Sequence, residues 1–73
     1  GRYREAAECF RRATLLEPED REVWLALGVS RAILGQREGA ADAVQRLRAI
    51  DPAKARELET IVEQIARQRA GQR

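Results

Sequence analysis

One spacing constrains this 73-residue chain more than any other feature: small, apolar and helix-breaking residues recur 34 positions apart. The two prolines, Pro18 and Pro52, obey this spacing. The other matched pairs are Gly1 and Gly35, Ala6 and Ala40, Ala7 and Ala41, Glu8 and Asp42, Phe10 and Val44, Arg12 and Arg46, Leu16 and Ile50, Glu17 and Asp51, Trp24 and Leu58, Leu27 and Ile61, and Ala32 and Ala66. Because such positions set packing and turns, the match predicts a repeated structural unit.

Within each unit the apolar residues recur at steps of three and four, which indicates helices. The chain is rich in Ala, Arg, Glu and Leu, and these residues favour helix over strand. Asp20 is predicted to cap a helix, Gly35 to close one in the left-handed conformation, and Pro18 and Pro52 to interrupt helices. Short connections force neighbouring helices to be antiparallel, so we predict an all-α fold. The four predicted helices cover residues 2–16, 20–34, 37–50 and 53–69.

The first predicted helix carries one apolar face and the only cysteine. The face consists of Tyr3, Ala6, Ala7, Phe10, Ala13 and either Leu16 or Leu15. Cys9 lies beside this face, so we expect a partly buried structural thiol. A reactive thiol is the alternative, but Arg12 and Glu5 nearby roughly cancel, and a low thiol pKa needs a basic setting. A single cysteine excludes an internal disulfide and favours a cytoplasmic, reducing compartment.

The second predicted helix is apolar nearly all round, and such a helix must be buried on most sides. Trp24 is expected to be a core residue. Gly28 costs about 1 kcal/mol in a helix interior, so we expect it to let the backbone of a partner helix come close. Leu25, Val29 and Ile33 form a further stripe at four-residue steps. That stripe is interpreted either as a binding surface or as packing between repeats.

A 34-residue helix–turn–helix period resembles the tetratricopeptide repeat family. Residues 21–54 read as one full copy, with Trp24, Leu27 and Gly28 matching its W-x2-L-G start. Further matches in this copy are Gly35 at the turn, Ala40 at the close approach, Val44 in place of an aromatic, and Pro52 at the end. The resemblance implies a single α-α superhelix fragment over 1–73. Residues 1–20 would be the second half of a preceding copy, and 55–73 a capping helix.

The same resemblance implies a protein-interaction module that holds a peptide or helical segment of another protein in a concave groove. The groove residues it implies are Glu22, Leu25, Ala26, Val29, Ile33, Glu59 and Glu63. Some family members clamp a terminal carboxylate with Lys and Asn, but Leu25, Ala26 and Val29 occupy those positions here. An apolar or amphipathic partner segment is therefore expected. The alternative is a purely structural terminal segment of a larger repeat protein.

The inventory of side chains argues against catalysis and against a metal or cofactor. The chain has no His, so Thr14, Ser30 and Thr60 have no base to activate them. Ligands for zinc and phosphate-binding glycine loops are also missing from the sequence. We therefore predict that the protein is not an enzyme. No stretch of the sequence is apolar enough to span a membrane.

The net charge is +2, and acidic residues are interspersed with basic ones almost everywhere. Arg67, Arg69 and Arg73 form the one basic run, interpreted as a solvated helix end. The alternative is that this run contacts phosphate groups. Because the rest of the chain forms no broad basic surface, nucleic acid is not the expected partner. The Ala- and Arg-rich usage favours a GC-rich bacterial source. If a preceding helix is missing, apolar surface on the first two helices predicts a two-fold homodimer through that face.

Overall fold

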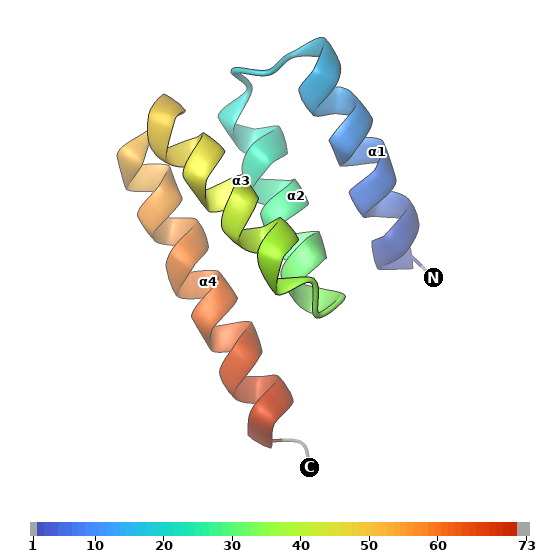
Figure 1. The fold of residues 1–73 in the computed structure, drawn as a ribbon, viewed down its shortest axis with the longest axis vertical. Helices are drawn as coiled ribbons and strands as arrows, with labels where there is room; N and C mark the ends of the chain where they lie inside the picture. Colours follow the sequence, from blue (N-terminus) through green and yellow to red (C-terminus); the bar gives the residue numbers. More distant parts are fainter. Residues whose placement is uncertain (1, 72–73) are drawn as a thin grey trace.

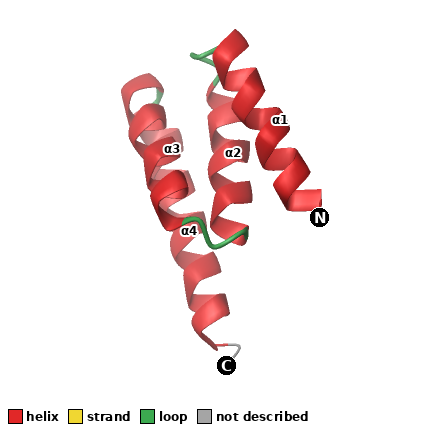
Figure 2. Ribbon diagram, turned by 45° about the vertical axis from the view of Figure 1, so that its right-hand side comes forward, coloured by secondary structure: helices red, strands yellow, loops and turns green. Residues whose placement is uncertain are grey.

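The computed structural model describes residues 2–71, which form four helices and, within that range, no strand. The helices are α1 (Arg2–Leu16), α2 (Arg21–Ile33), α3 (Arg37–Ile50) and α4 (Pro52–Gly71). This confirms the predicted all-α fold with four helices and places their ends within two residues of the predicted ones. Successive helices run antiparallel, so α2 and α4 run in the same direction (Figures 1 and 2).

Helix α2 is the central element because it contacts α1, α3 and α4, whereas α1 contacts α2 alone among the described helices. The core lies where α2, α3 and α4 meet. Its fully buried large side chains are Leu27, Leu47 and Leu58, one from each of these helices. Trp24, Ala43, Val44 and Ala55 complete the buried cluster. The prediction that Trp24 belongs to the core is therefore confirmed.

The predicted helix ends of α2 are confirmed atom by atom. The Asp20 carboxylate accepts hydrogen bonds from the amides of Glu22 and Val23 at 3.1 and 3.3 Å, which satisfies free donors at the first turn. At the other end Gly35 has a φ of 79°. The amides of Gly35 and Gln36 return to the carbonyls of Ala32 and Arg31, which is the Schellman arrangement.

Gly28 marks the closest approach in the core. A Cβ added there would lie 2.5 Å from Leu58 Cδ2 of α4 and 3.2 Å from the Ala43 Cβ of α3. Gly28 therefore has a packing role, but the groups that fill the space are the Leu58 side chain and the Ala43 Cβ rather than the helix backbone that the sequence predicted. A second α2 contact comes from Arg31. Its guanidinium donates to the Gly39 carbonyl at 3.0 Å and so joins α2 to α3.

One sequence prediction for α1 is wrong, because Cys9 is exposed rather than partly buried. Leu15 and Leu16 of the predicted apolar face are exposed as well. Thr14 is buried instead, with its hydroxyl donating to the Arg11 carbonyl at 2.6 Å. The physical reason is that α1 packs only against α2, so just one side of α1 is covered. Periodicity located an apolar face, but not how much of it a neighbour would cover.

Candidate partner-binding surface

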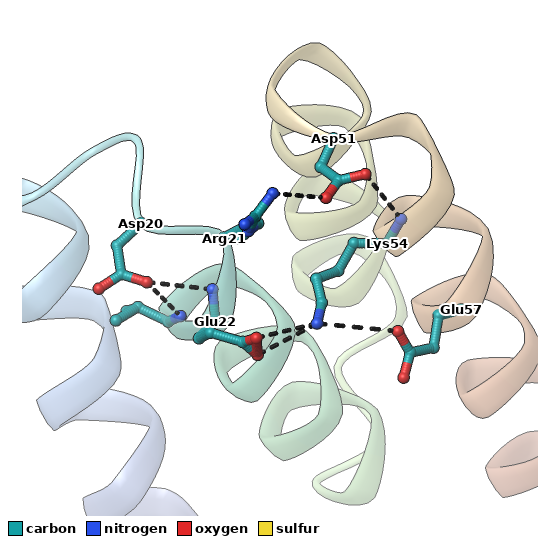
Figure 3. Close-up of polar contacts among 7 residues, drawn as sticks. Asp20, Arg21, Glu22, Asp51, Lys54 and Glu57 are labelled. Atoms are coloured by element: carbon teal, nitrogen blue, oxygen red, sulfur yellow. Dashed lines mark hydrogen bonds and ion pairs between the residues drawn. The ribbon is translucent and has the colours of Figure 1, made fainter.

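The first predicted groove residue, Glu22, is tied to α4 by an ion pair. Lys54 Nζ lies 2.9 Å from Glu22 Oε2 and also approaches Glu57 at 4.0 Å (Figure 3). The hydrogen bond from Lys54 to Glu22 raises the pKa of the Lys54 ammonium, because the carboxylate stabilises its charged form. Glu22 therefore joins two helices at the start of α2.

Asp51 makes the second link at this end of the molecule (Figure 3). One of its carboxylate oxygens accepts from the Lys54 amide at 3.2 Å, and the other accepts from the Arg21 guanidinium at 3.1 Å. The hydrogen bond from the Lys54 amide, and after it the hydrogen bond from Arg21, hold the pKa of the Asp51 carboxyl below its usual value. Asp51 thus caps α4 and connects it to the first residue of α2.

The apolar part of the predicted groove lies on α2 and is only half exposed. Leu25 and Val29 pack against the core cluster, as do Ala7 and Phe10 of α1. Ala26 and Ile33 are also half-buried. Much of this row therefore serves packing within the chain, which was the second of the two interpretations left open by the sequence. The apolar surface it offers to a partner is smaller than the sequence suggested.

The last two predicted residues, Glu59 and Glu63, lie in a hollow between α3 and α4. The hollow has a volume of about 400 Å³. It is lined by Arg37, Ala41, Val44, Gln45, Arg48, Glu59, Val62, Glu63 and Ala66. Glu59 is bound across it to the Arg48 guanidinium at 2.9 Å. None of the lining residues comes from α2, so the structure does not bring these two carboxylates together with the α2 row in this hollow.

The lining of this α3–α4 hollow combines apolar and charged side chains. Its apolar residues are Ala41 and Val44 of α3 and Val62 and Ala66 of α4. Its charged residues are Arg37 and Arg48 from α3, and Glu59 and Glu63 from α4. The resemblance pointed only to the two glutamates. The lining residues of α3 recur at steps of four and three, as in 37, 41, 44 and 48, so the sequence marks them as one helix face. That this face pairs with residues of α4 becomes visible only in the structure.

A second hollow of about 410 Å³ adjoins the first and shares Arg37, Val62 and Ala66 with it. Its lining residues come from the turn between α2 and α3 with the adjoining ends of those helices, and from the C-terminal half of α4. Its remaining lining residues are Ala32, Gly35, Ala40, Arg69 and Ala70. The two hollows together form a continuous depression along α4.

The basic run at the end of the chain divides in the structure. The Arg69 guanidinium donates to the Ile33 carbonyl at 2.8 Å, and so occupies a free acceptor at the end of α2. A cation at a helix C-terminus also interacts favourably with the helix dipole. Arg67 is exposed on α4, and Arg73 lies outside the described residues. Arg67 and Arg69 are both exposed, as the solvated interpretation expects, and Arg69 in addition caps the end of α2.

Other kinds of site receive no support from the described residues. Within residues 2–71 no three His, Cys, Asp or Glu side chains gather closely enough to hold a metal ion. No helix in that range is long and apolar enough to cross a membrane. Comparison of the chain with models of known protein families, with curated proteins and with solved structures finds no significant match.

Proposed function

We propose that this chain is a protein-binding segment of the tetratricopeptide type, and that the α3–α4 hollow receives an apolar side chain of a partner peptide or helix. The observation that carries the proposal is a lining that combines apolar residues of both helices with two arginines from α3 and two glutamates from α4. Sites that bind protein segments use an apolar pocket for affinity and a few polar groups for orientation. The 34-residue repeat and the Gly28 contact support the assignment to this type of fold.

The chemistry of the hollow bounds the partner. A volume of about 400 Å³ admits one or two side chains, not a folded element. Val44 and Val62 offer branched apolar contacts, and Ala41 and Ala66 add small apolar side chains to the lining. The Arg48–Glu59 ion pair joins α3 to α4 beside them. A segment with an apolar anchor flanked by charges of both signs fits this arrangement best.

The α2 row contributes less in this proposal. Ala26 and Ile33 remain half exposed and can contact a partner that extends beyond the hollow. Glu22 acts through its pair with Lys54, which keeps the first turns of α2 and α4 together. Our proposal therefore keeps part of the groove that the family resemblance implies. It puts the main binding site between α3 and α4 instead of on α2.

The test is a selection of binding peptides from a random peptide library on the immobilised chain, followed by affinity measurements on variants. Ala41→Glu and Ala66→Glu each add a charge to an exposed apolar position of the lining and should weaken binding of the selected peptide at least tenfold. Ala49→Glu makes the same change at an exposed position of α3 that does not line the hollow, and should leave affinity unchanged. Helicity by circular dichroism checks that all three variants fold.

Two results would contradict the proposal. If Ala26→Glu abolishes binding while Ala66→Glu does not, the α2 row is the binding surface. If selection enriches no peptide, the second candidate is favoured, in which the chain is a structural terminal segment of a larger repeat protein. An observation supports that candidate: the outer side of α4 carries the exposed polar residues Arg56, Glu57, Thr60, Gln64 and Arg67. A polar outer face is typical of a capping helix.

A further inference from the structure

The 34-residue repeat places the same kind of helix face on α1 and on α3. Within residues 2–71, that face is fully buried on α3 and partly exposed on α1. On α3 this face contains Ala40, Ala43 and Leu47, which are each at most 1% exposed because α2 packs on them. The matching residues of α1, 34 positions earlier, are Ala6, Cys9 and Ala13. Cys9 is exposed, whereas its counterpart Ala43 has no exposed surface. The matched Leu16 and Ile50 extend the two faces, and Leu16 is 84% exposed.

We call Ala6, Cys9, Ala13 and Leu16 the α1 outer face. Within residues 2–71 α1 contacts only α2, and this contact leaves Cys9 and Leu16 exposed and Ala6 and Ala13 half-buried. The face contains no charged residue, so covering it buries no unpaired charge. Three of its members are small, which allows another helix backbone to approach closely, as α2 approaches α3 at Gly28 and Ala43. The α1 outer face lies away from the α3–α4 hollow and is independent of the proposed function.

The charges at the two ends of α1 say which kind of helix fits. Arg2 and Arg4 lie in the first turn together with Glu5, which leaves that end with a net positive charge, and Glu17 and Glu19 follow the last turn. In an isolated helix this order is unfavourable, because the N-terminal end of a helix carries partial positive charge. The other three helices each have a basic residue in the last turn, and α1 has none. Within the described part of the chain, the two arginines and the two glutamates after the last turn form no ion pair.

We propose that a second copy of this chain covers the α1 outer face, with the two α1 helices packed antiparallel about a two-fold axis. That arrangement puts the Arg2–Arg4 end of each copy beside the Glu17–Glu19 end of the other. It also opposes the two helix dipoles. A parallel pair would place arginine against arginine at one end and glutamate against glutamate at the other. Cys9 is the middle residue of α1, so the two Cys9 side chains meet near the axis.

Sedimentation equilibrium over a range of concentrations measures the association directly. The unmodified chain should approach twice its monomer mass as concentration rises. Ala13→Glu should remain monomeric, whereas Ala49→Glu, the same change on an exposed position of α3, should dimerise like the unmodified chain. A chain that stays monomeric at 1 mM contradicts the proposal, and so does an Ala13→Glu variant that dimerises fully.

Charge reversal tests the antiparallel direction and needs no core residue. The pair Arg2→Glu with Arg4→Glu makes both ends acidic, and the pair Glu17→Arg with Glu19→Arg makes both ends basic. Each double variant alone should dimerise at least tenfold more weakly than the unmodified chain. An equimolar mixture of the two should dimerise again, because each acidic end then meets a basic end. Unchanged association of each double variant alone would exclude the antiparallel pairing.

The rate of disulfide formation between the two Cys9 side chains tests independently whether they lie close to the two-fold axis. Two Cys9 thiols form one S–S bond and transfer two hydrogens to diamide, which is reduced to its hydrazine. The unmodified chain should give a disulfide-linked dimer at least tenfold faster than a Cys9→Ser chain that carries Ala49→Cys. That control keeps one exposed helical thiol but moves it off the α1 outer face. Equal rates for the two chains would place Cys9 away from the axis and overturn the proposed geometry.

Discussion

Leu58 of α4 packs directly on Gly28 of α2, so closely that a Cβ at position 28 would lie 2.5 Å from one Leu58 methyl carbon and 2.9 Å from the other. Leu58 is completely buried, so its side chain has no solvent to move into. This contact brings three helices together, because the same added Cβ would lie 3.2 Å from Ala43 of α3. The stability of the fold therefore depends on the absence of one methyl group.

Gly28→Ala should destabilise the chain even though alanine favours helix. The helix gain is about 1 kcal/mol, while forcing a methyl group into a packed core costs roughly 1–3 kcal/mol. We expect a net loss on the order of 1 kcal/mol in the free energy of unfolding, measured by urea denaturation. Gly71→Ala is the matched control, since nothing lies within 4 Å of the added Cβ. In a Leu58→Ala background the cost of Gly28→Ala should shrink or vanish, and purely additive effects would contradict the contact.

Gly35→Ala should destabilise the chain for a different reason. The φ of 79° at Gly35 is a left-handed conformation that costs a residue with a Cβ about 1–2 kcal/mol. Gly35→Asn should cost less, because Asn tolerates this conformation. Urea denaturation of both variants measures the order. The nearest group to the added Cβ is the exposed Arg69 guanidinium, which can move aside. Equal costs for Ala and Asn would mean that backbone strain is not the cause.

The charge of Asp51 should make stability depend on pH in the acid range. Its pKa is lowered in the folded chain, first by the Lys54 amide and then by Arg21. The charge therefore contributes its full stabilisation above the unfolded pKa of about 3.9, and loses it as the pH falls through the lower folded value. Asp51→Asn keeps a capping side chain but removes the charge.

The difference in unfolding free energy between the unmodified chain and Asp51→Asn should be largest at neutral pH and disappear below the folded pKa. Thermal unfolding at a series of pH values measures it. In an Arg21→Gln background the difference should be smaller but still present, since the Lys54 amide remains. A difference that grows on acidification would reverse the sign of the proposed coupling.

Trp24→Phe should cost more than the loss of ring size alone. The indole nitrogen of Trp24 donates to the Pro18 carbonyl at 2.7 Å, and Trp24 is buried. Loss of this bond costs about 1–3 kcal/mol if the carbonyl is left without a partner. Tyr3→Leu, at an exposed aromatic position, should stay within about 0.5 kcal/mol of the unmodified chain. Guanidinium denaturation of both variants provides the comparison, and equal effects would contradict a structural role for the indole bond.

The local structure of this chain is largely written in its sequence. Asp20 and Gly35 act through backbone groups only a few residues away, and Pro18 and Pro52 restrict their own neighbours. The four helices, their short connections and the buried Trp24 followed from such local signals and from the apolar spacing. That Gly28 has a packing role was also foreseen, because a glycine inside a helix is costly unless packing repays it.

Coverage of each face was decided only by tertiary structure. Cys9 and Ala43 occupy matched positions of the repeat, yet one is exposed and the other is completely buried. Glu59 and Glu63 fall beside α3 rather than beside the α2 row. Arg69 reaches a carbonyl 36 positions away. Periodicity tells which side of a helix is apolar, but burial depends on which neighbour docks there, and that depends on contacts between residues far apart in the chain.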